Sequence, residues 1–358
     1  MTAVRAERLL ALLPEAQVDV MLVTDLINVR YLTGYTGSNG VAVIGPQTRT
    51  FITDFRYVEQ AAAEVDPSFD RIRAQQDLIE AVPDMLPPGE LRLGFEDNHL
   101  SVRTHTRLRE LFEDRVELVA AGGLIERLRM VKGSDEIEQI RAASELADAS
   151  FRALIEGGLV GRTERELALA LQQDMRQRGA KRPSFDAIVA AGPQGALPHA
   201  QPRDVEVGKN ELVVIDWGAE LDGYCSDCTR TVATGDPGEE ARRVYELVLQ
   251  AQLAGLEAVK AGANGRDVDS VARGAIEEGG YGENFGHGLG HGVGLAVHEA
   301  PRLSQRSEDD LESGNIVTVE PGIYLPGLGG CRIEDLAVVR EDGLELLTSF
   351  PKELVEVG

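Results

Sequence analysis

Short segments rich in apolar residues alternate with segments of helical periodicity in the first third of the chain. VDVMLV, LRLGFE and VELVAA are typical of strands, and VAVIG with TRTFITD is typical of a hairpin that leads into a helix near Phe55. NVRYLTG is also predicted to be a strand, followed by a glycine-rich turn. Apolar positions three to four apart over residues 5–13 and 101–112 predict helices. Strands that alternate with helices in this way indicate a small α/β domain.

Helices become longer in the rest of the chain. A connector is expected over residues 123–132, and a long helix is expected to begin at Ser134, an N-cap with acidic residues in its first turn. Thr163 begins a second helix, because its Thr-x-x-Glu spacing to Glu166 is a capping box. The remaining expected elements are a strand at AIVAAG, a hairpin over 212–232, and helices over 238–260 and 266–279. Helices interleaved with antiparallel strands predict an α+β domain.

Length and composition fit a soluble protein of two domains. The 358 residues, 43% of them hydrophobic, suffice for two sizeable cores, which we place at residues 1–129 and 130–358. No apolar run approaches the roughly 18 residues of a membrane span. The N-terminal segment MTAVRAERLLALLPEA is amphipathic and mixed in charge, unlike a signal peptide. We therefore expect a cytoplasmic protein without a membrane partner.

Charge and cysteine content exclude further classes. A formal net charge of −24 argues against nucleic acid as a partner, since phosphate binding needs a basic surface; solubility explains this charge better than attraction of cations does. The three cysteines do not form a secreted disulfide framework. Cys225 and Cys228 spell CSDC, but a zinc knuckle normally needs a second pair, and only Cys331 remains. Structural thiols are the better interpretation.

The segment Gly286–Glu299, GHGLGHGVGLAVHE, concentrates the candidate chemistry, because it holds three of the six histidines. A helical zinc pair of His287 and His291 is disfavoured, since each glycine costs a helix interior about 1 kcal/mol. In an extended backbone the two side chains still share a face, because they are four residues apart. The competing interpretation is a glycine-rich surface loop with incidental histidines.

Carboxylates on or beside strand-like segments complete a candidate metal site. Asp216 follows the apolar run LVVI, Asp227 lies on the expected returning strand, Glu320 follows NIVTV, and Glu334 stands in GGCRIED. An acidic side chain in such a place is costly unless it is paired or binds a cation. Four carboxylates and one neutral imidazole carry a charge of about −4, which favours two divalent ions over one.

These motifs resemble the pita-bread metallopeptidases, the creatinase and aminopeptidase family. HGLGHGVGLAVHEAP, VEPGIY and CRIED are similar to the motifs of its proline-specific branch, the Xaa-Pro peptidases, and ITDFRY resembles the creatinase-type N-terminal domain. The resemblance implies a pita-bread catalytic domain of α+β class behind a smaller α/β domain, and a homodimer. It also implies five ligands, which are Asp216, Asp227, His291, Glu320 and Glu334.

The same resemblance assigns roles and a cofactor. Asp227 and Glu334 would bridge two divalent ions, with manganese expected first and cobalt, zinc or iron as alternatives. His298 and His199 would stabilise the tetrahedral intermediate, and Glu320 would act in catalysis as well as ligation. The implied substrate-binding residues are His287, Tyr324 and Arg332. From the residues alone, Arg332 is expected to hold Glu334 ionised, whereas His199 is better interpreted as a loop histidine beside a proline.

The implied activity is hydrolysis of the bond between an N-terminal residue and proline. We slightly favour an Xaa-Pro dipeptidase over an aminopeptidase that acts on longer peptides. Arg332, Arg49 or Arg56 is the candidate anchor for a dipeptide carboxylate. Phe185 is a candidate wall for the proline ring, although core packing is the better interpretation of this residue. Another hydrolase on the same fold, such as a creatinase or a methionine aminopeptidase, and a peptide-binding module without catalysis remain as competing hypotheses.

Overall fold

The computed structural model describes residues 2–75, 77–112 and 114–358. Contacts divide the chain into two compact units, of which the first ends at Arg129 and the second spans Met130–Gly358. The division falls at the end of a short helix, α5 (Leu124–Met130), within the segment where the sequence led us to expect a connector. Within the described residues, no helix is long and apolar enough to cross a membrane.

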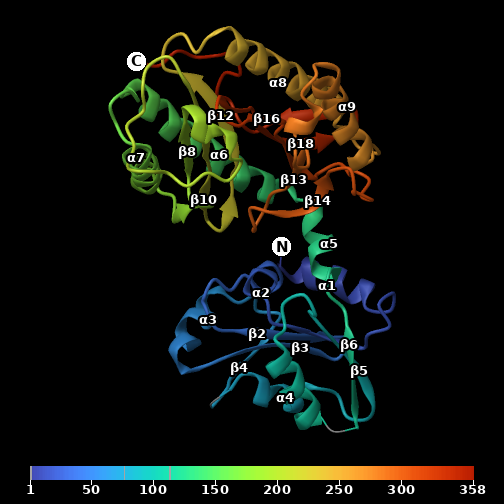
Figure 1. Cartoon of the computed structure of the whole chain (residues 1–358). Coiled ribbons are helices and arrows are strands. Elements are labelled where there is room, and N and C mark those ends of the chain that lie inside the picture. The colour runs from blue at the N-terminus through green and yellow to red at the C-terminus, as the bar shows by residue number, and fades with distance from the viewer. Residues whose placement is uncertain (1, 76, 113) are drawn as a thin grey trace. The chain divides into compact units, whose positions relative to one another are not determined.

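The N-terminal unit is built on one mixed sheet. Its six strands lie in the order β4-β3-β2-β1-β5-β6, with β1–β5, β5–β6 and β3–β4 parallel and the other pairs antiparallel. Helices α1 and α2 lie on one face of this sheet and α4 on the other (Figure 1). Its elements are α1 (Thr2–Leu12), β1 (Val20–Val23), α2 (Leu26–Thr33), β2 (Val41–Gly45), β3 (Thr48–Thr53), η1 (Phe55–Tyr57), α3 (Val58–Glu64), β4 (Asp70–Arg73), η2 (Ile79–Met85), β5 (Leu91–Phe95), α4 (Val102–Phe112) and β6 (Val116–Ala120).

The expected strand at NVRYLTG was wrong, because this segment lies in helix α2. Local capping decides the outcome. The Asp25 side chain accepts a hydrogen bond from the Ile27 N–H at 3.0 Å and so closes the first turn. Gly34 ends the helix at φ +85°, where its N–H bonds to the Arg30 carbonyl. Aromatic and branched residues therefore pack against the core from a helix rather than from a strand.

The second unit, later called the catalytic unit because it holds the candidate site, contains several small sheets and two pairs of long helices. Its strands form three larger sheets, β11-β10-β7, β12-β9-β8 and β14-β13-β15-β18-β19, and the pair β16-β17. Its elements are α6 (Ser134–Glu156), α7 (Glu164–Gln177), β7 (Arg182–Pro183), β8 (Ile188–Ala191), η3 (Gly192–Ala196), β9 (Leu212–Trp217), β10 (Ala219–Leu221), β11 (Tyr224–Cys225), β12 (Cys228–Ala233), α8 (Glu239–Ala258), α9 (Gly265–Glu278), η4 (Gly282–Asn284), β13 (Gly290–Gly292), β14 (Glu299–Leu303), β15 (Ile316–Val319), β16 (Gly322–Leu325), β17 (Gly329–Arg332), β18 (Asp335–Arg340) and β19 (Gly343–Leu346).

Each helix pair of this unit packs over its own group of strands. Helices α6 and α7 share a core with β8 and β9, in which the rings of Phe151 and Trp217 stack with their centroids 3.9 Å apart. Helices α8 and α9 lie side by side (Figure 1); α8 contacts β15 and β17, α9 contacts β14, and Val248 and Val317 belong to this second core. Strands from both groups therefore meet between the helix pairs, which is where the candidate site lies.

Two of the expected helix starts follow from local signals. The capping box at Thr163 is confirmed, because the Glu166 N–H donates to the Thr163 hydroxyl at 3.1 Å and the Thr163 N–H donates to the Glu166 carboxylate at 2.8 Å. Helix α6 does begin at Ser134, but Gly133 is its N-cap rather than Ser134 itself. The Glu136 carboxylate accepts the Gly133 N–H at 3.1 Å and so closes that turn.

Candidate metal centre

Carboxylates reach one place from the ends of two antiparallel strand pairs. Asp216 lies on β9, and Asp227 immediately precedes the partner strand β12. Glu320 immediately follows β15, and Glu334 immediately precedes β18. The β15–β18 register, continued by one residue, places Glu320 opposite Glu334. Residues that are far apart in the sequence are thus brought together by the sheet registers.

His291 points its ring into this group from β13. Its Nδ1 lies 3.1 Å from the Gly292 carbonyl oxygen, which can only accept, so Nδ1 carries the ring proton and Nε2 has a free lone pair. Nε2 lies 3.3 Å from Glu320 Oε1 and 3.6 Å from Asp227 Oδ2. The imidazole is therefore held in the tautomer and orientation of a metal ligand. The extended backbone expected here is observed, although β13 has only three residues.

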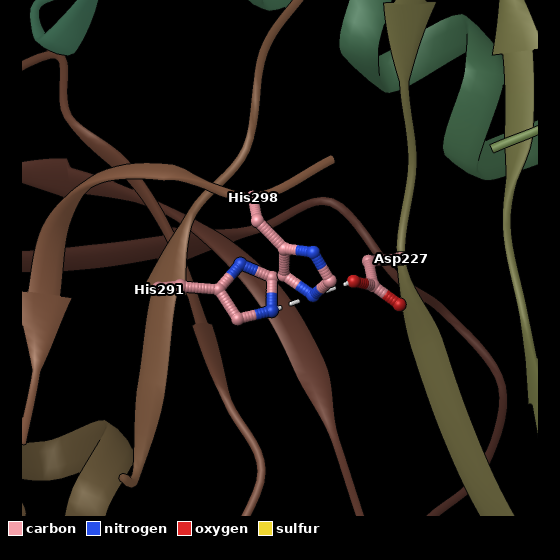
Figure 2. Close-up of side chains that lie close together, drawn as sticks. All are labelled: Asp227, His291 and His298. Atoms are coloured by element: carbon pink, nitrogen blue, oxygen red, sulfur yellow. Dashed lines mark ion pairs between the residues drawn. The ribbon is translucent and has the colours of Figure 1, made fainter. Parts of the chain in front are cut away.

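All five expected ligands take part in groups of three whose ligand atoms lie within 4.8 Å of one another. These groups are Asp216 with Asp227 and Glu334, His291 with Glu320 and Glu334, and Asp227 with His291 and His298. The third group was not expected, since we assigned His298 to the substrate. Figure 2 shows its ring next to that of His291 and facing the Asp227 carboxylate, and the two ring centroids are 4.4 Å apart.

The electrostatics of the group fit cations. Burial, followed by the charges of the neighbouring carboxylates, raises the pKa of Asp227 and of Glu334 well above the usual range. Asp216 has a raised pKa for the same first reason, and its Oδ1 has no hydrogen-bond partner among the described residues. Burial also acts to raise the pKa of Glu320, but His291, together with His287 and Arg332, outweighs it, and the pKa is lowered to about 2. Carboxylates crowded in this way, with lone pairs left over, suit divalent ions.

Arg332 pairs with a different carboxylate from the one we expected. Its guanidinium lies 2.7 Å from Asp216 Oδ2, so its direct ion pair is with Asp216, although its charge also acts to lower the pKa of Glu334, as expected. The remaining donors bond to the Thr229 hydroxyl at 3.0 Å, the Tyr324 hydroxyl at 2.9 Å and the Pro198 carbonyl at 3.2 Å. The arginine therefore holds Asp216 in place, and all three of its guanidinium nitrogens already donate hydrogen bonds within the site.

His287 and Tyr324 continue the hydrogen-bonded chain that begins at Arg332. The Arg332 guanidinium donates to the Tyr324 hydroxyl, which lies 2.9 Å from His287 Nε2. His287 Nδ1 lies 2.8 Å from the Gly288 carbonyl, so Nε2 is the accepting nitrogen. Burial lowers the pKa of His287, which keeps the ring neutral near pH 7. Tyr324 is not among the described residues that line the cavity, so its contact with a substrate is indirect, through His287.

A cavity of about 480 Å³ opens over the carboxylates and is lined by all five expected ligands. His199, His287 and His298 also line it, which excludes the interpretation of His199 as a loop histidine away from the site. Phe185 is half-buried in its wall, so the core-packing interpretation of this residue was wrong. Partial burial, together with the nearby His291, lowers the pKa of His298 to about 4, and the ring is therefore neutral at pH 7.

Two contributors were missed in the sequence. Thr229 lies opposite Asp216 in the β9–β12 register, and its hydroxyl donates to Glu334 at 2.7 Å. Assigning a register to the expected hairpin would have placed Thr229 beside Asp216 and so indicated its role. Arg302 lies opposite His291 in the β13–β14 register; it is exposed and lines the cavity. Strand β14 was not among the expected elements, so nothing in the sequence placed Arg302 opposite His291.

The three cysteines lie outside the metal-binding groups. All are free and buried, and burial raises the pKa of Cys225 and of Cys331 to about 12. Thiols with such pKa values are poor ligands and poor nucleophiles. In the described part of the chain no cysteine belongs to a group that could hold a metal ion, which leaves the structural interpretation in place of the zinc knuckle.

The fold and the site together define a hydrolase of the metallopeptidase class. The chain matches the model of metallopeptidase family M24 over residues 138–341 and the creatinase/prolidase N-terminal domain over residues 5–131. It therefore belongs to metallopeptidase family M24, and the expected architecture of a creatinase-type domain before a pita-bread domain is confirmed.

Relatives and solved structures cover the whole chain. An Xaa-Pro dipeptidase of Pyrococcus furiosus is 37% identical over 353 residues, which cover 98% of this chain and 99% of that protein. The structure of an Xaa-Pro dipeptidase from Bacillus anthracis is 40% identical, with a TM-score of 0.96 and 100% of both chains covered. An X-Pro aminopeptidase from Thermotoga maritima is 38% identical, with a TM-score of 0.89 and coverage of 99% of this chain and 100% of that one.

Proposed function

We propose that this protein is a proline-specific metalloexopeptidase that removes an N-terminal residue from proline, with dipeptides as its preferred substrates. The observation that carries the proposal is the group of buried carboxylates and one oriented imidazole on the floor of a cavity of about 480 Å³. The family supports peptide hydrolysis, and similar proteins described as Xaa-Pro dipeptidases support the substrate class.

The ligands would be Asp216, Asp227, His291, Glu320 and Glu334, with Asp227 and Glu334 shared between two divalent ions. Manganese is our first candidate, because the set is rich in oxygen and has a single imidazole; cobalt, zinc and iron are the alternatives. When bound, the ions would lower the pKa of a water molecule and polarise the scissile carbonyl. Thr229 and Arg332 hold Glu334 and Asp216 in place.

The remaining side chains would act on the substrate. His298 and His199 face the cavity, and a neutral His298 can donate a hydrogen bond to the oxygen on which negative charge develops. Glu320 also faces the cavity, where its carboxylate can accept a proton from the attacking water. His287 also lines the cavity, where its ring can contact the substrate, and this ring is oriented by Tyr324.

Proline specificity needs a cavity that binds its substrate without a hydrogen bond from the N–H of the scissile bond. An Xaa-Pro bond has no N–H, so a peptidase that needs that donor fails on it. The walls offer apolar surface instead, from Phe185, Ile188 and Pro198, against which a pyrrolidine ring can pack.

Arg302 supports the dipeptide preference. A dipeptide ends in a carboxylate after proline, and a guanidinium is a strong partner for it. Arg302 is exposed at the cavity, whereas the donors of Arg332 bond within the site. The other two candidate anchors lie in ion pairs of their own unit, Arg49 with Glu7 at 2.6 Å and Arg56 with Asp54 at 2.7 Å. We therefore assign the anchor to Arg302.

The test compares kcat/KM for Ala-Pro, Ala-Pro-Ala and a longer Xaa-Pro peptide. We expect Ala-Pro to be hydrolysed fastest, and Arg302→Met to raise the KM for Ala-Pro on the order of tenfold, the value of one charged contact. Arg306→Met is the matched control, because Arg306 is exposed close to Arg302 in the sequence but is not among the residues that line the cavity. Faster turnover of the longer peptides would favour an X-Pro aminopeptidase instead.

The quaternary state and location complete the proposal. We propose a cytoplasmic homodimer in which the unit ending at Arg129 is the N-terminal domain and the unit Met130–Gly358 is the catalytic domain. Free, buried thiols are consistent with a reducing compartment. The net charge of −24 again argues against nucleic acid as a partner. Light scattering during size-exclusion chromatography would test the dimer, and a mass of about one chain would refute it.

A further inference from the structure

The segment Gly286–Glu299 carries three histidines of the site on an intrinsically flexible backbone. It contains five glycines, each of which loses more conformational freedom on folding than any other residue. The glycines are needed because neighbouring strands approach too closely for side chains: a Cβ at Gly290 would overlap the Thr318 carbonyl, and one at Gly292 the Ala300 carbonyl. Since glycine has no side chain to pack, other residues must hold this segment.

A buried ion pair on helix α9 holds the N-terminal end of the segment. Arg273 and Asp269 form two parallel contacts of 2.8 and 2.9 Å, and the Asp269 side chain is fully buried. The same guanidinium donates to the Phe285 carbonyl at 2.9 Å and to the His287 carbonyl at 2.7 Å. Asp269 accepts the Leu289 N–H at 2.9 Å. One pair of side chains thus fixes backbone groups of three alternate residues, at His287 and on both sides of it.

This N-terminal contact continues toward the metal ligands. The carbonyl of Leu289 accepts the N–H of Glu320 at 2.8 Å, so the backbone held by Asp269 also supports a ligand. The guanidinium of Arg273 lies 4.2 Å from the ring centroid of Phe285 and adds a cation–π contact. Neither Asp269 nor Arg273 lines the catalytic cavity, so both act through the backbone.

A second buried ion pair holds the C-terminal end. Lys132 Nζ lies 2.6 Å from Glu299 Oε1, with the two side chains only 1% and 7% exposed. Glu299 directly follows His298, and its other carboxylate oxygen lies 3.5 Å from the Ala296 N–H in the turn before it. Glu299 is also the register partner of Gly292, at the bulge beside His291. The lysine therefore stabilises the turn that presents His298.

We propose that Asp269–Arg273 and Lys132–Glu299 are two positioning pairs that fix opposite ends of the histidine segment. The first orients His287 and the second orients His298. None of the four residues touches the substrate. The inference rests on the proposed peptidase function for its kinetic consequence, but its structural claim concerns only the backbone of Gly286–Glu299.

The kinetic test uses Arg273→Met and Lys132→Met in the manganese-loaded full chain, with Ala-Pro as substrate. We expect kcat/KM to fall on the order of 10²-fold in each, because displacement of a catalytic group by about 1 Å has that effect, while the metal content stays at the wild-type value. Arg182→Met is the matched control. Arg182 Nε lies 2.5 Å from Glu220 Oε2, and the Glu220 side chain is only 6% exposed. The substitution therefore removes a partner of a buried glutamate, but neither residue lines the cavity.

A local structural readout separates positioning from general stability. Hydrogen exchange followed by mass spectrometry should show faster exchange over residues 286–291 in Arg273→Met and over 295–300 in Lys132→Met, and no change there in the control. Kinetic constants within twofold of wild type would overturn the proposal. Faster exchange throughout the catalytic unit, together with loss of metal, would overturn it as well, because the pairs would then be merely structural.

A neutral double variant covers the case in which a lone buried carboxylate prevents folding. Lys132→Met/Glu299→Gln carries no unpaired charge, and we expect it to unfold at the wild-type temperature and still show reduced kcat. Lys132→Arg keeps the pair and should restore kcat. Recovery of kcat in the neutral double variant would overturn the proposal. If the wild-type protein does not hydrolyse Ala-Pro, the proposed function fails, whereas the exchange data still decide this inference because they need no substrate.

Discussion

The N-terminal unit and the catalytic unit each contain a group of three carboxylates whose oxygens lie within 4.8 Å of one another. In the N-terminal unit the group is Asp25, Glu96 and Glu126. In the catalytic unit one such group is Asp216, Asp227 and Glu334. Proximity alone does not separate the two, so the difference must lie in what else surrounds the oxygens.

Hydrogen-bond donors surround the carboxylates of the N-terminal unit. One oxygen of Glu96 accepts the N–H groups of Thr24 and Asp25 at 2.6 and 2.8 Å, and the other accepts from the Asn28 amide at 2.8 Å. The same amide donates to Glu126 at 2.9 Å. Burial raises the pKa of Glu96, although these donors act in the opposite direction. The group is therefore a hydrogen-bonded support for the start of α2.

Other carboxylates surround those of the catalytic unit. Asp216 Oδ1 has no partner among the described residues, and the pKa values of Asp227 and Glu334 are raised first by burial and then by neighbouring acids. Such a group is stable in its ionised form only beside cations. The comparison teaches that the number of available donors, rather than the number of nearby acids, distinguishes a structural acidic group from a metal site.

The largest predicted effect comes from removal of a shared ligand. Asp227→Ala should lose metal, and activity should fall to background, since both ions would share that carboxylate. Metal analysis together with Ala-Pro hydrolysis measures this. Glu96→Gln is the matched control from the other group and should keep both metal and kcat. An Asp227→Ala protein that retained two ions and wild-type kcat would remove Asp227 from the ligand set.

The next effect concerns His298, whose ring nitrogen also lies close enough to Asp227 and His291 to be a ligand. We predict that His298→Ala keeps the metals and lowers kcat on the order of 10²-fold, as expected for a lost transition-state contact. The measurement is metal content beside kcat in the same preparation. If the substitution strips a metal ion, His298 is a ligand and its assignment to the substrate is wrong.

Local signals in the sequence predicted much of the fold. The Thr163 capping box and the helices α8 and α9 were expected close to their observed places, because capping and apolar periodicity are local properties. NVRYLTG failed because its residues favour strands, whereas Asp25 and Gly34 cap it as a helix. Short strands such as β14 carry almost no periodic signal.

The site was predictable only in part for a similar reason. The four acidic positions and their grouping into one metal site could be predicted from the residues, but the choice of His291 as the fifth ligand and the role of each ligand came from the family resemblance. Asp216 and Arg332 are 116 residues apart, and only the sheet registers bring them together. Arg332 was therefore assigned to Glu334, its neighbour in the sequence, when its partner is Asp216. Arg302 was missed because its strand was missed.

A smaller effect is predicted for the N-terminal group. Glu96→Ala leaves the buried N–H groups of Thr24 and Asp25 without their acceptor, and this should lower the free energy of unfolding by about 1–3 kcal/mol. Metal content and kcat should not change. Urea unfolding of the full chain measures the loss, and a shift in metal content would instead indicate a metal-binding role for Glu96.

The smallest effect is a pH dependence of the metal-free protein. A carboxyl whose pKa is raised by folding, as at Asp227 and Glu334, binds more protons folded than unfolded. The carboxyl makes its full contribution to the free energy of unfolding below its unfolded pKa of about 4. This contribution is lost as the pH rises toward the pKa of the same carboxyl in the folded protein. The Tm after chelation should therefore fall between pH 5 and pH 8, and added manganese should flatten this slope. Parallel curves with and without metal would speak against cation binding by these carboxylates.

Metal content of the fully active wild-type protein tests the central claim most directly. Purified protein, loaded with manganese and freed of excess ions, should contain about two ions per chain, because five ligand side chains with four carboxylates balance two divalent charges. Chelation should abolish Ala-Pro hydrolysis, and manganese or cobalt should restore it. One ion or none in a fully active preparation would contradict the dinuclear site.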